Sequence, residues 1–154
     1  MTLVILSGGI DLSVGAVIAF SGVFIAVMLR DTGLHPLAVF AILLGLTTAF
    51  GAAMGFLIDR LAMPAFIVTL AGMFLARGAA YLLSVQSVPI THPFFGQLQG
   101  AYVLMPGKGR LTLIGVLMLA VFAVGMVIAH RTRFGTSVYA LGGGAQTARL
   151  MGVP

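Results

Sequence analysis

The chain has 154 residues, of which 60% are hydrophobic and only 7% are charged. Soluble domains are about 45–50% apolar and about 25% charged. A soluble globule is therefore excluded, and the net charge of +5 comes from scattered basic residues that form no nucleic-acid-binding patch. The absence of cysteine excludes thiol catalysis and thiolate metal sites. We expect an all-α integral membrane protein embedded in a lipid bilayer.

Charge-free runs predict where the chain crosses the membrane. A helix needs about 20 apolar residues to span the hydrocarbon core. Four segments meet this requirement, at residues 12–29, 37–58, 61–85 and 111–129. They predict a polytopic helical bundle of four complete transmembrane helices in one membrane domain.

The segment 1–11 is predicted to be the end of a longer, broken helix. Its apolar beginning is too short to span, and Gly8 and Gly9 would bend or break a helix in this setting. A short interfacial lead-in at a true N-terminus is the alternative. Ionisable residues in apolar segments are candidates for function, so Asp11 with Ser13 is a candidate lining of a transport path. A cap on the following helix is the other interpretation of Asp11, since a carboxylate near a helix start is stabilised by about 0.3–1 kcal/mol, and both roles can hold together.

The connections between these helices differ in length. Residues 30–36 and 59–64 form tight turns, so neighbouring helices are antiparallel. The long connection 86–110 contains Phe94 and Phe95, which suit the headgroup level. If the helices alternate, four basic residues lie on one side and three on the other (Arg60, Arg131, Arg133 and Arg149 against Arg30, Lys108 and Arg110). This small difference weakly places 130–154 in the cytoplasm.

Arg77 is the one charge in the run 61–85. It follows Leu61 by sixteen positions, or about 24 Å of helix. At that depth its side chain can reach the far interface or join an internal ion pair. Lining a polar path is the alternative role.

Small residues recur every four positions along 37–58, at Ala41, Gly45, Ala49 and Ala53, together with Gly51 and Gly55. Such stripes let helix backbones approach closely. Packing within one subunit is the first expectation, and pairing of two subunits is the second.

The polar, glycine-rich tail 130–154 contains one predicted short helix, Gln146–Met151. Gly142–Gly144 would introduce this helix and Gly152 would end it. A docking element for a partner and an ordinary loop both fit the pattern. The docking candidates lie on this helix and its flanks (Gly143, Gln146, Ala148, Arg149, Leu150 and Gly152).

The sequence offers no site for chemistry. Three acidic residues and three histidines lie in separate segments, which predicts neither a metal site nor an acid–base pair. Lys108 is not followed by Ser or Thr, so the glycines around it do not form a phosphate-binding loop. We expect no catalytic residue, metal or cofactor on this chain.

Three motifs, in order along the chain, resemble those of the ribose-type sugar permeases of bacterial ATP-binding cassette (ABC) importers. They are Gly8–Gly15, Pro64–Met73 with Arg77 after it, and Arg133–Val153. Residues Met63–Arg77 and Pro89–Pro93 are similar to the galactofuranose permease type in particular. The chain departs from the family pattern at Gly143-Gly144-Ala145, where an asparagine is usual near the second glycine.

The resemblance implies a partial ABC importer permease fold, because family members are longer and have more helices. It makes 86–110 a periplasmic loop that faces a periplasmic sugar-binding protein. It makes 130–154 a cytoplasmic coupling region that sits on an ATP-binding subunit, which holds the ATP and Mg. Two permease subunits, identical or homologous, would surround a path for a galactofuranose-like or ribose-like monosaccharide in the bacterial inner membrane. The chain would thus be a transport subunit, with ATP hydrolysis on its partner.

Two other classes of function fit the residues alone. An ion-coupled secondary transporter would use Asp11 in a broken-helix ion site and need no ATPase. A structural membrane subunit would have no transport path of its own.

Overall fold

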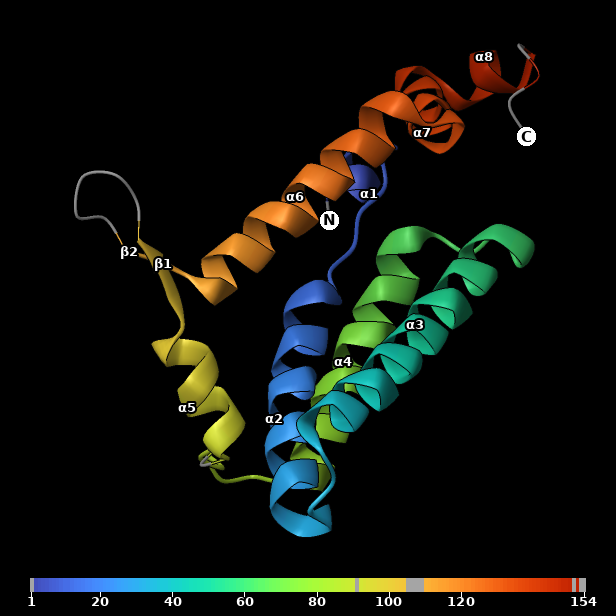
Figure 1. Cartoon of the computed structure of the whole chain (residues 1–154). Coiled ribbons are helices and arrows are strands. Elements are labelled where there is room, and N and C mark those ends of the chain that lie inside the picture. The colour runs from blue at the N-terminus through green and yellow to red at the C-terminus, as the bar shows by residue number, and fades with distance from the viewer. Residues whose placement is uncertain (1, 91, 105–109, 151, 153–154) are drawn as a thin grey trace. The chain divides into compact units, whose positions relative to one another are not determined.

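The computed structural model describes residues 2–90, 92–104, 110–150 and 152. The chain divides into two compact units, Ile10–His92 and a second formed by Met1–Gly9 with Pro93–Pro154 (Figure 1). Throughout the described residues, both units are helical apart from one short β-hairpin.

The unit Ile10–His92 is a bundle of three helices. These are α2 (Val14–Thr32), α3 (Pro36–Arg60) and α4 (Ala65–Leu83). α2 packs along α4 and also touches α3, while α3 and α4 meet over a shorter region. The buried side chains between them are small, such as Ala26 on α2 and Ala76 on α4. Gly72 marks the crossing of α4 and α3, because a Cβ at this position would overlap the sulfur of Met54.

Backbone geometry, not charge, sets the end of α2. This helix continues through Arg30 and Asp31 and stops at Gly33, whose φ of 62° is left-handed. Charged residues at a helix end can lie in the headgroup layer without breaking the helix, whereas a left-handed residue ends it.

α4 begins later than expected, at Ala65 and not at residue 61, so the predicted helix 61–85 is corrected at its start. Leu61 caps α3, and Ala62 has a positive φ of 51°. Pro64 then precedes the first turn of α4, which begins at Ala65. The apolar run continues through this turn, so hydropathy alone could not show it.

The stripe of small residues on α3 does not pack within the described chain. A Cβ added at Gly45, Gly51 or Gly55 would meet nothing within 4 Å. The helix instead buries Val39 and Leu43. The set Ala41, Gly45, Ala49 and Ala53 is offset from these residues by two positions, about 200° around a helix of 3.6 residues per turn. Packing of the stripe against another part of the same subunit, or against a second subunit, therefore stays a prediction.

The other unit holds the remaining elements. They are α1 (Thr2–Leu6), α5 (Pro93–Gly100), β1 (Tyr102–Leu104), β2 (Arg110–Thr112), α6 (Leu113–Arg131), α7 (Arg133–Gly143) and α8 (Ala145–Leu150). The strands are antiparallel, with Tyr102 opposite Thr112 and Leu104 opposite Arg110. The helical fold class is confirmed, and the segment 86–110, expected as a loop, contains the short helix α5 and one side of this hairpin. Short strand-forming runs on both sides of a Pro- and Gly-rich segment favour a hairpin.

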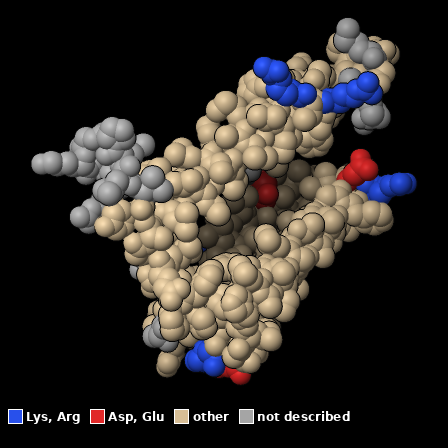
Figure 2. Space-filling model, in the orientation of Figure 1, with Lys and Arg blue, Asp and Glu red and all other residues tan. Residues whose placement is uncertain are grey.

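Four helices are long and apolar enough to cross a membrane, namely α2, α3, α4 and α6. Between 6% and 22% of the residues in each of these spans are buried. Figure 2 shows helix surfaces almost without charge, with most charged side chains toward the ends of the helices. Apolar surface of this extent suits lipid or other membrane helices. The prediction of a helical, multi-pass membrane protein is confirmed.

Candidate functional site

The predicted helix break lies between α1 and α2, where residues 7–13 are not helical. Gly8 has a left-handed φ of 77°. The N–H of Gly8 donates to the carbonyl of Ile5 (3.0 Å), and that of Gly9 donates to the carbonyl of Val4 (2.9 Å). These bonds close the last turn of α1 in the manner of a glycine C-cap. The break is thus present, and its place in a transport path stays a prediction.

Asp11 holds the start of α2 through Ser13. Its Oδ1 accepts a bond from the backbone N–H of Ser13 (2.8 Å) and another from the Ser13 hydroxyl (2.7 Å). Ser13 is the N-cap residue of α2 and only 2% exposed. Asp11 therefore fixes the residue that precedes the helix, as carboxylates commonly do in local turns. This geometry favours the capping interpretation of Asp11.

Arg77 lies on α4, twelve positions after Ala65, which is about 18 Å of helix. Its side chain is exposed and borders a recess of about 460 Å³ on the unit Ile10–His92. The recess also contains hydroxyl and amide side chains from the end of α4 and the residues after it. Arg77 thus shares a recess with polar residues of its own chain.

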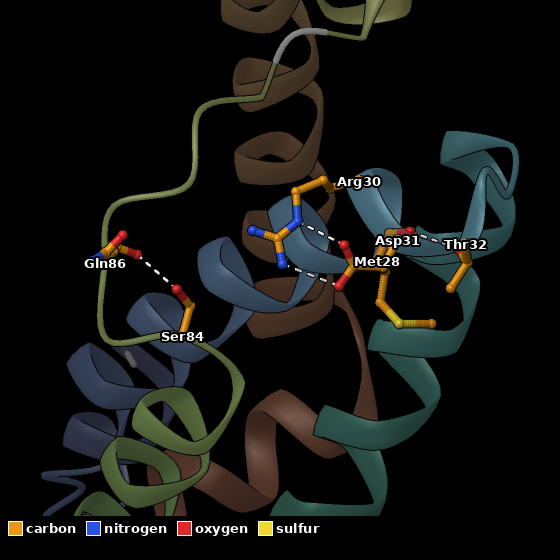
Figure 3. A network of polar contacts seen from close by, with 6 residues as sticks. All are labelled: Met28, Arg30, Asp31, Thr32, Ser84 and Gln86. Atoms are coloured by element: carbon orange, nitrogen blue, oxygen red, sulfur yellow. Dashed lines mark hydrogen bonds and ion pairs between the residues drawn. The ribbon is translucent and has the colours of Figure 1, made fainter.

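Polar contacts gather at the C-terminal ends of α2 and α4 (Figure 3). Arg30 donates from Nε to Oδ1 of Asp31 (2.6 Å) and from Nη2 to Oδ2 (3.1 Å). The Ser84 hydroxyl donates to the main-chain carbonyl of Gln86 (2.8 Å). The first contact pairs the charges at the end of α2, and the second fixes the turn that leaves α4.

The C-terminal region is more helical than predicted, because Arg133–Gly143 forms α7. Thr132 caps this helix by accepting a bond at its Oγ1 from the N–H of Gly135 (3.2 Å). Gly135 also lies against the main-chain carbonyl of Ala129, where no Cβ would fit. The close corner between α6 and α7 therefore requires glycine. Thr132 was the available sequence signal, since Thr is a preferred N-cap residue.

α7 packs against α1, at the far end of the sequence (Figure 1). The contact is closest at Gly142, where a Cβ would overlap the main-chain carbonyl oxygen of Leu6. Gly143, the next residue, has open space around it. These glycines were expected to introduce the coupling helix, and both instead lie in the last turn of α7. Gly144 separates α7 from α8.

α8 corresponds to the predicted coupling helix. Its described exposed residues include Gln146 and Leu150, the latter 86% exposed. Ala148 is only 3% exposed, so its side chain is buried and offers no docking surface among the described residues. Gly152 has a left-handed φ of 80°. Met151 and the side chain of Arg149 lie outside the described residues.

Comparison with known proteins identifies the family. The family model described as branched-chain amino acid transport system / permease component matches residues 1–154. The chain belongs to this permease family. No solved structure matches the chain with significance.

Three curated relatives of this permease family match nearly the whole chain. The chain is 58% identical over 153 residues to the inner membrane ABC transporter permease protein YjfF of Escherichia coli (strain K12). It is 39% identical to the fructose import permease protein FruG of Bifidobacterium longum and 35% identical to the ribose import permease protein RbsC of Escherichia coli (strain K12). These matches cover 99–100% of the chain and 46–47% of each relative, so the chain spans about half their length. The resemblance to ribose-type sugar permeases is confirmed.

Proposed function

We propose that the protein provides part of the membrane permease subunit of an ABC importer that carries a monosaccharide across the bacterial inner membrane. The observation that carries this proposal is the family match along all described residues, together with relatives named as fructose and ribose import permeases. Four apolar helices supply the membrane-embedded part. The motifs Met63–Arg77 and Pro89–Pro93 favour a galactofuranose-like or ribose-like sugar.

The proposed partners follow from this assignment. An ATP-binding subunit holds ATP and Mg and supplies the energy, while this chain supplies the path and makes no catalytic contribution. A second permease subunit, identical or homologous, completes the path. A periplasmic sugar-binding protein delivers the sugar to the segment 86–110, which contains α5 and the hairpin.

The packing of the C-terminal helices supports a coupling route. The exposed Gln146 and Leu150 of α8 form the surface offered to the ATP-binding subunit. α8 contacts α7, and α7 packs on α1 at Gly142. Because packed helices transmit displacement to their neighbours, movement of α8 is carried to α1 and to the break that follows it.

An ion-coupled transporter is the alternative from a different class. It needs the Asp11 carboxylate free to hold an ion. Among the described residues, this carboxylate accepts two hydrogen bonds from Ser13, which supports a local structural role.

Assembly with the ATP-binding subunit tests the proposal. The protein and the ATP-binding subunit of the same importer are produced together and purified through a tag on one of them. We expect the wild-type protein to co-purify with the ATP-binding subunit. Leu150→Asp places a charge on the docking surface, so we expect this variant to lose co-purification. Leu150→Met is the matched control and keeps the complex. A wild-type protein that never binds the ATP-binding subunit, although folded, contradicts the proposal.

A further inference from the structure

Arg77 and the recess beside it form a polar site within an apolar bundle. The helix α4 carries this one charge among apolar side chains, six positions before its end at Leu83. Ionisable residues inside membrane spans are costly and generally face a polar cavity or a partner. The recess of about 460 Å³ next to Arg77 is a cavity of this kind.

The polar lining of the recess comes from the end of α4 and the segment that follows. Tyr81 and Ser84 contribute hydroxyl groups, Gln86 an amide and Ser87 a further hydroxyl. The hydroxyls of Tyr81 and Ser87 and the amide of Gln86 can both donate and accept hydrogen bonds, the Ser84 hydroxyl can accept, and the guanidinium of Arg77 adds donors only. The recess therefore offers several hydrogen-bonding groups around a single positive charge.

The turn after α4 places these groups together. The backbone N–H of Ser84 donates to the carbonyl of Ala80 (3.0 Å), which ends the helix. The Ser84 hydroxyl then donates to the main-chain carbonyl of Gln86 (2.8 Å), and Figure 3 shows the two residues facing each other. This bond uses the main chain of Gln86 and leaves its side-chain amide available to the recess.

Small residues on α2 keep the space open. Ala19 and Val23 line the recess opposite the polar residues. The same two residues, with Gln86 and Ser87, also line a second recess of about 250 Å³ that includes Gly22. The two recesses share Gln86 and Ser87 as polar lining residues, and we refer to them together as the depression between α2 and the segment after α4.

We infer that this depression is a sugar-binding station of the transport path, with Arg77, Gln86 and Ser87 as hydrogen-bonding residues for sugar hydroxyls. The inference rests on the proposed function and adds the residues that hold the substrate. A neutral polyhydroxylated ligand fits a lining rich in hydroxyl and amide groups. A lipid phosphate is recognised instead by clusters of Arg or Lys, whereas this recess has Arg77 alone among its described lining residues.

A tryptophan reporter gives a direct test, because these 154 residues contain no Trp. Tyr81→Trp places the reporter in the recess. Leu82→Trp is the matched control, since Leu82 is the next residue, is 90% exposed and does not line the recess. The purified protein is placed in phosphatidylcholine nanodiscs and titrated with galactose, ribose and fructose while fluorescence is recorded.

We expect at least one sugar to change the Tyr81→Trp emission in a saturable way and to leave the Leu82→Trp emission unchanged. Adding Ser87→Ala to the Tyr81→Trp protein weakens the apparent affinity about three- to tenfold, the effect of losing one hydrogen bond. Adding Arg77→Gln weakens it further. Circular dichroism of every variant verifies the helical content.

Three results overturn the inference. They are the absence of a sugar response, an equal response from both reporters, and a response to added phosphatidylglycerol but to no sugar. The last result identifies a lipid headgroup site. The proposed function is tested separately, because ATP-driven uptake that persists with a silent reporter refutes the sugar station and leaves the importer intact.

Discussion

The contact between α7 and α1 predicts opposite effects for two neighbouring glycines. In Gly142→Ala the new Cβ overlaps the main-chain carbonyl oxygen of Leu6, and this oxygen belongs to the backbone and cannot rotate away. In Gly143→Ala the new methyl group meets nothing within 4 Å. The two substitutions add the same atom in the same helix, so their difference isolates the contact with α1.

The magnitudes follow from two opposing contributions. Replacing a helical glycine by alanine stabilises the helix by about 0.5–1 kcal/mol, since it restricts the unfolded chain. Forcing an atom into a tight contact costs about 1–3 kcal/mol. We therefore expect Gly142→Ala to lower the free energy of unfolding by about 1–2 kcal/mol. Gly143→Ala leaves it unchanged or raises it slightly.

Thermal melts of the purified protein in detergent, followed by far-ultraviolet circular dichroism, measure this difference. A loss of 1 kcal/mol lowers the Tm of a chain of this size by roughly 2–4 °C. We expect Gly142→Ala to melt several degrees below Gly143→Ala. Equal melting temperatures for the two variants would refute a close approach of α7 to α1.

Two further pairs of variants test the ends of α2 in the same melts. Asp11→Ala removes the acceptor of two Ser13 bonds and is expected to cost about 1–2 kcal/mol, whereas Asp11→Asn keeps an oxygen there and costs less. Equal stability of Asp11→Ala and the wild type would show that the bonds do not hold the helix start. Gly33→Ala places a side chain at a φ of 62° and is expected to cost about 1 kcal/mol. Gly55→Ala, with open space around it, is expected to stabilise the protein, so a shift of both in the same direction contradicts the assigned backbone geometry.

Hydropathy predicts the membrane spans because the length and apolar character that a span requires can be read from each segment alone, without knowledge of its neighbours. The four runs free of charge or nearly so become α2, α3, α4 and α6, and the glycine pair after α1 becomes the break. Boundaries set by backbone geometry need other signals, such as Gly33 after α2 and Pro64 before α4.

Features that depend on tertiary contacts escape this kind of prediction. α7 is too polar to register as a membrane span, and its position depends on Gly135 at Ala129 and Gly142 at Leu6. The polar recess joins Arg77 to residues assigned to a loop, and only the turn after α4 brings them together. Ala148 was expected to dock a partner, but its side chain is buried. The sequence of a short helix does not indicate which of its faces is buried, because that depends on the neighbouring segments.

We propose that ATP on a partner subunit, and no ion gradient, drives sugar transport by the importer to which this chain contributes. The most direct test uses proteoliposomes that contain the complete importer and receive labelled ribose or galactofuranose with its sugar-binding protein. Uptake is measured with and without ATP at the ATP-binding subunit, and again after ionophores have collapsed proton and sodium gradients. We expect uptake that requires ATP and continues with the ionophores present. Uptake that proceeds without ATP and stops when the gradients collapse would contradict the importer and favour an ion-coupled transporter.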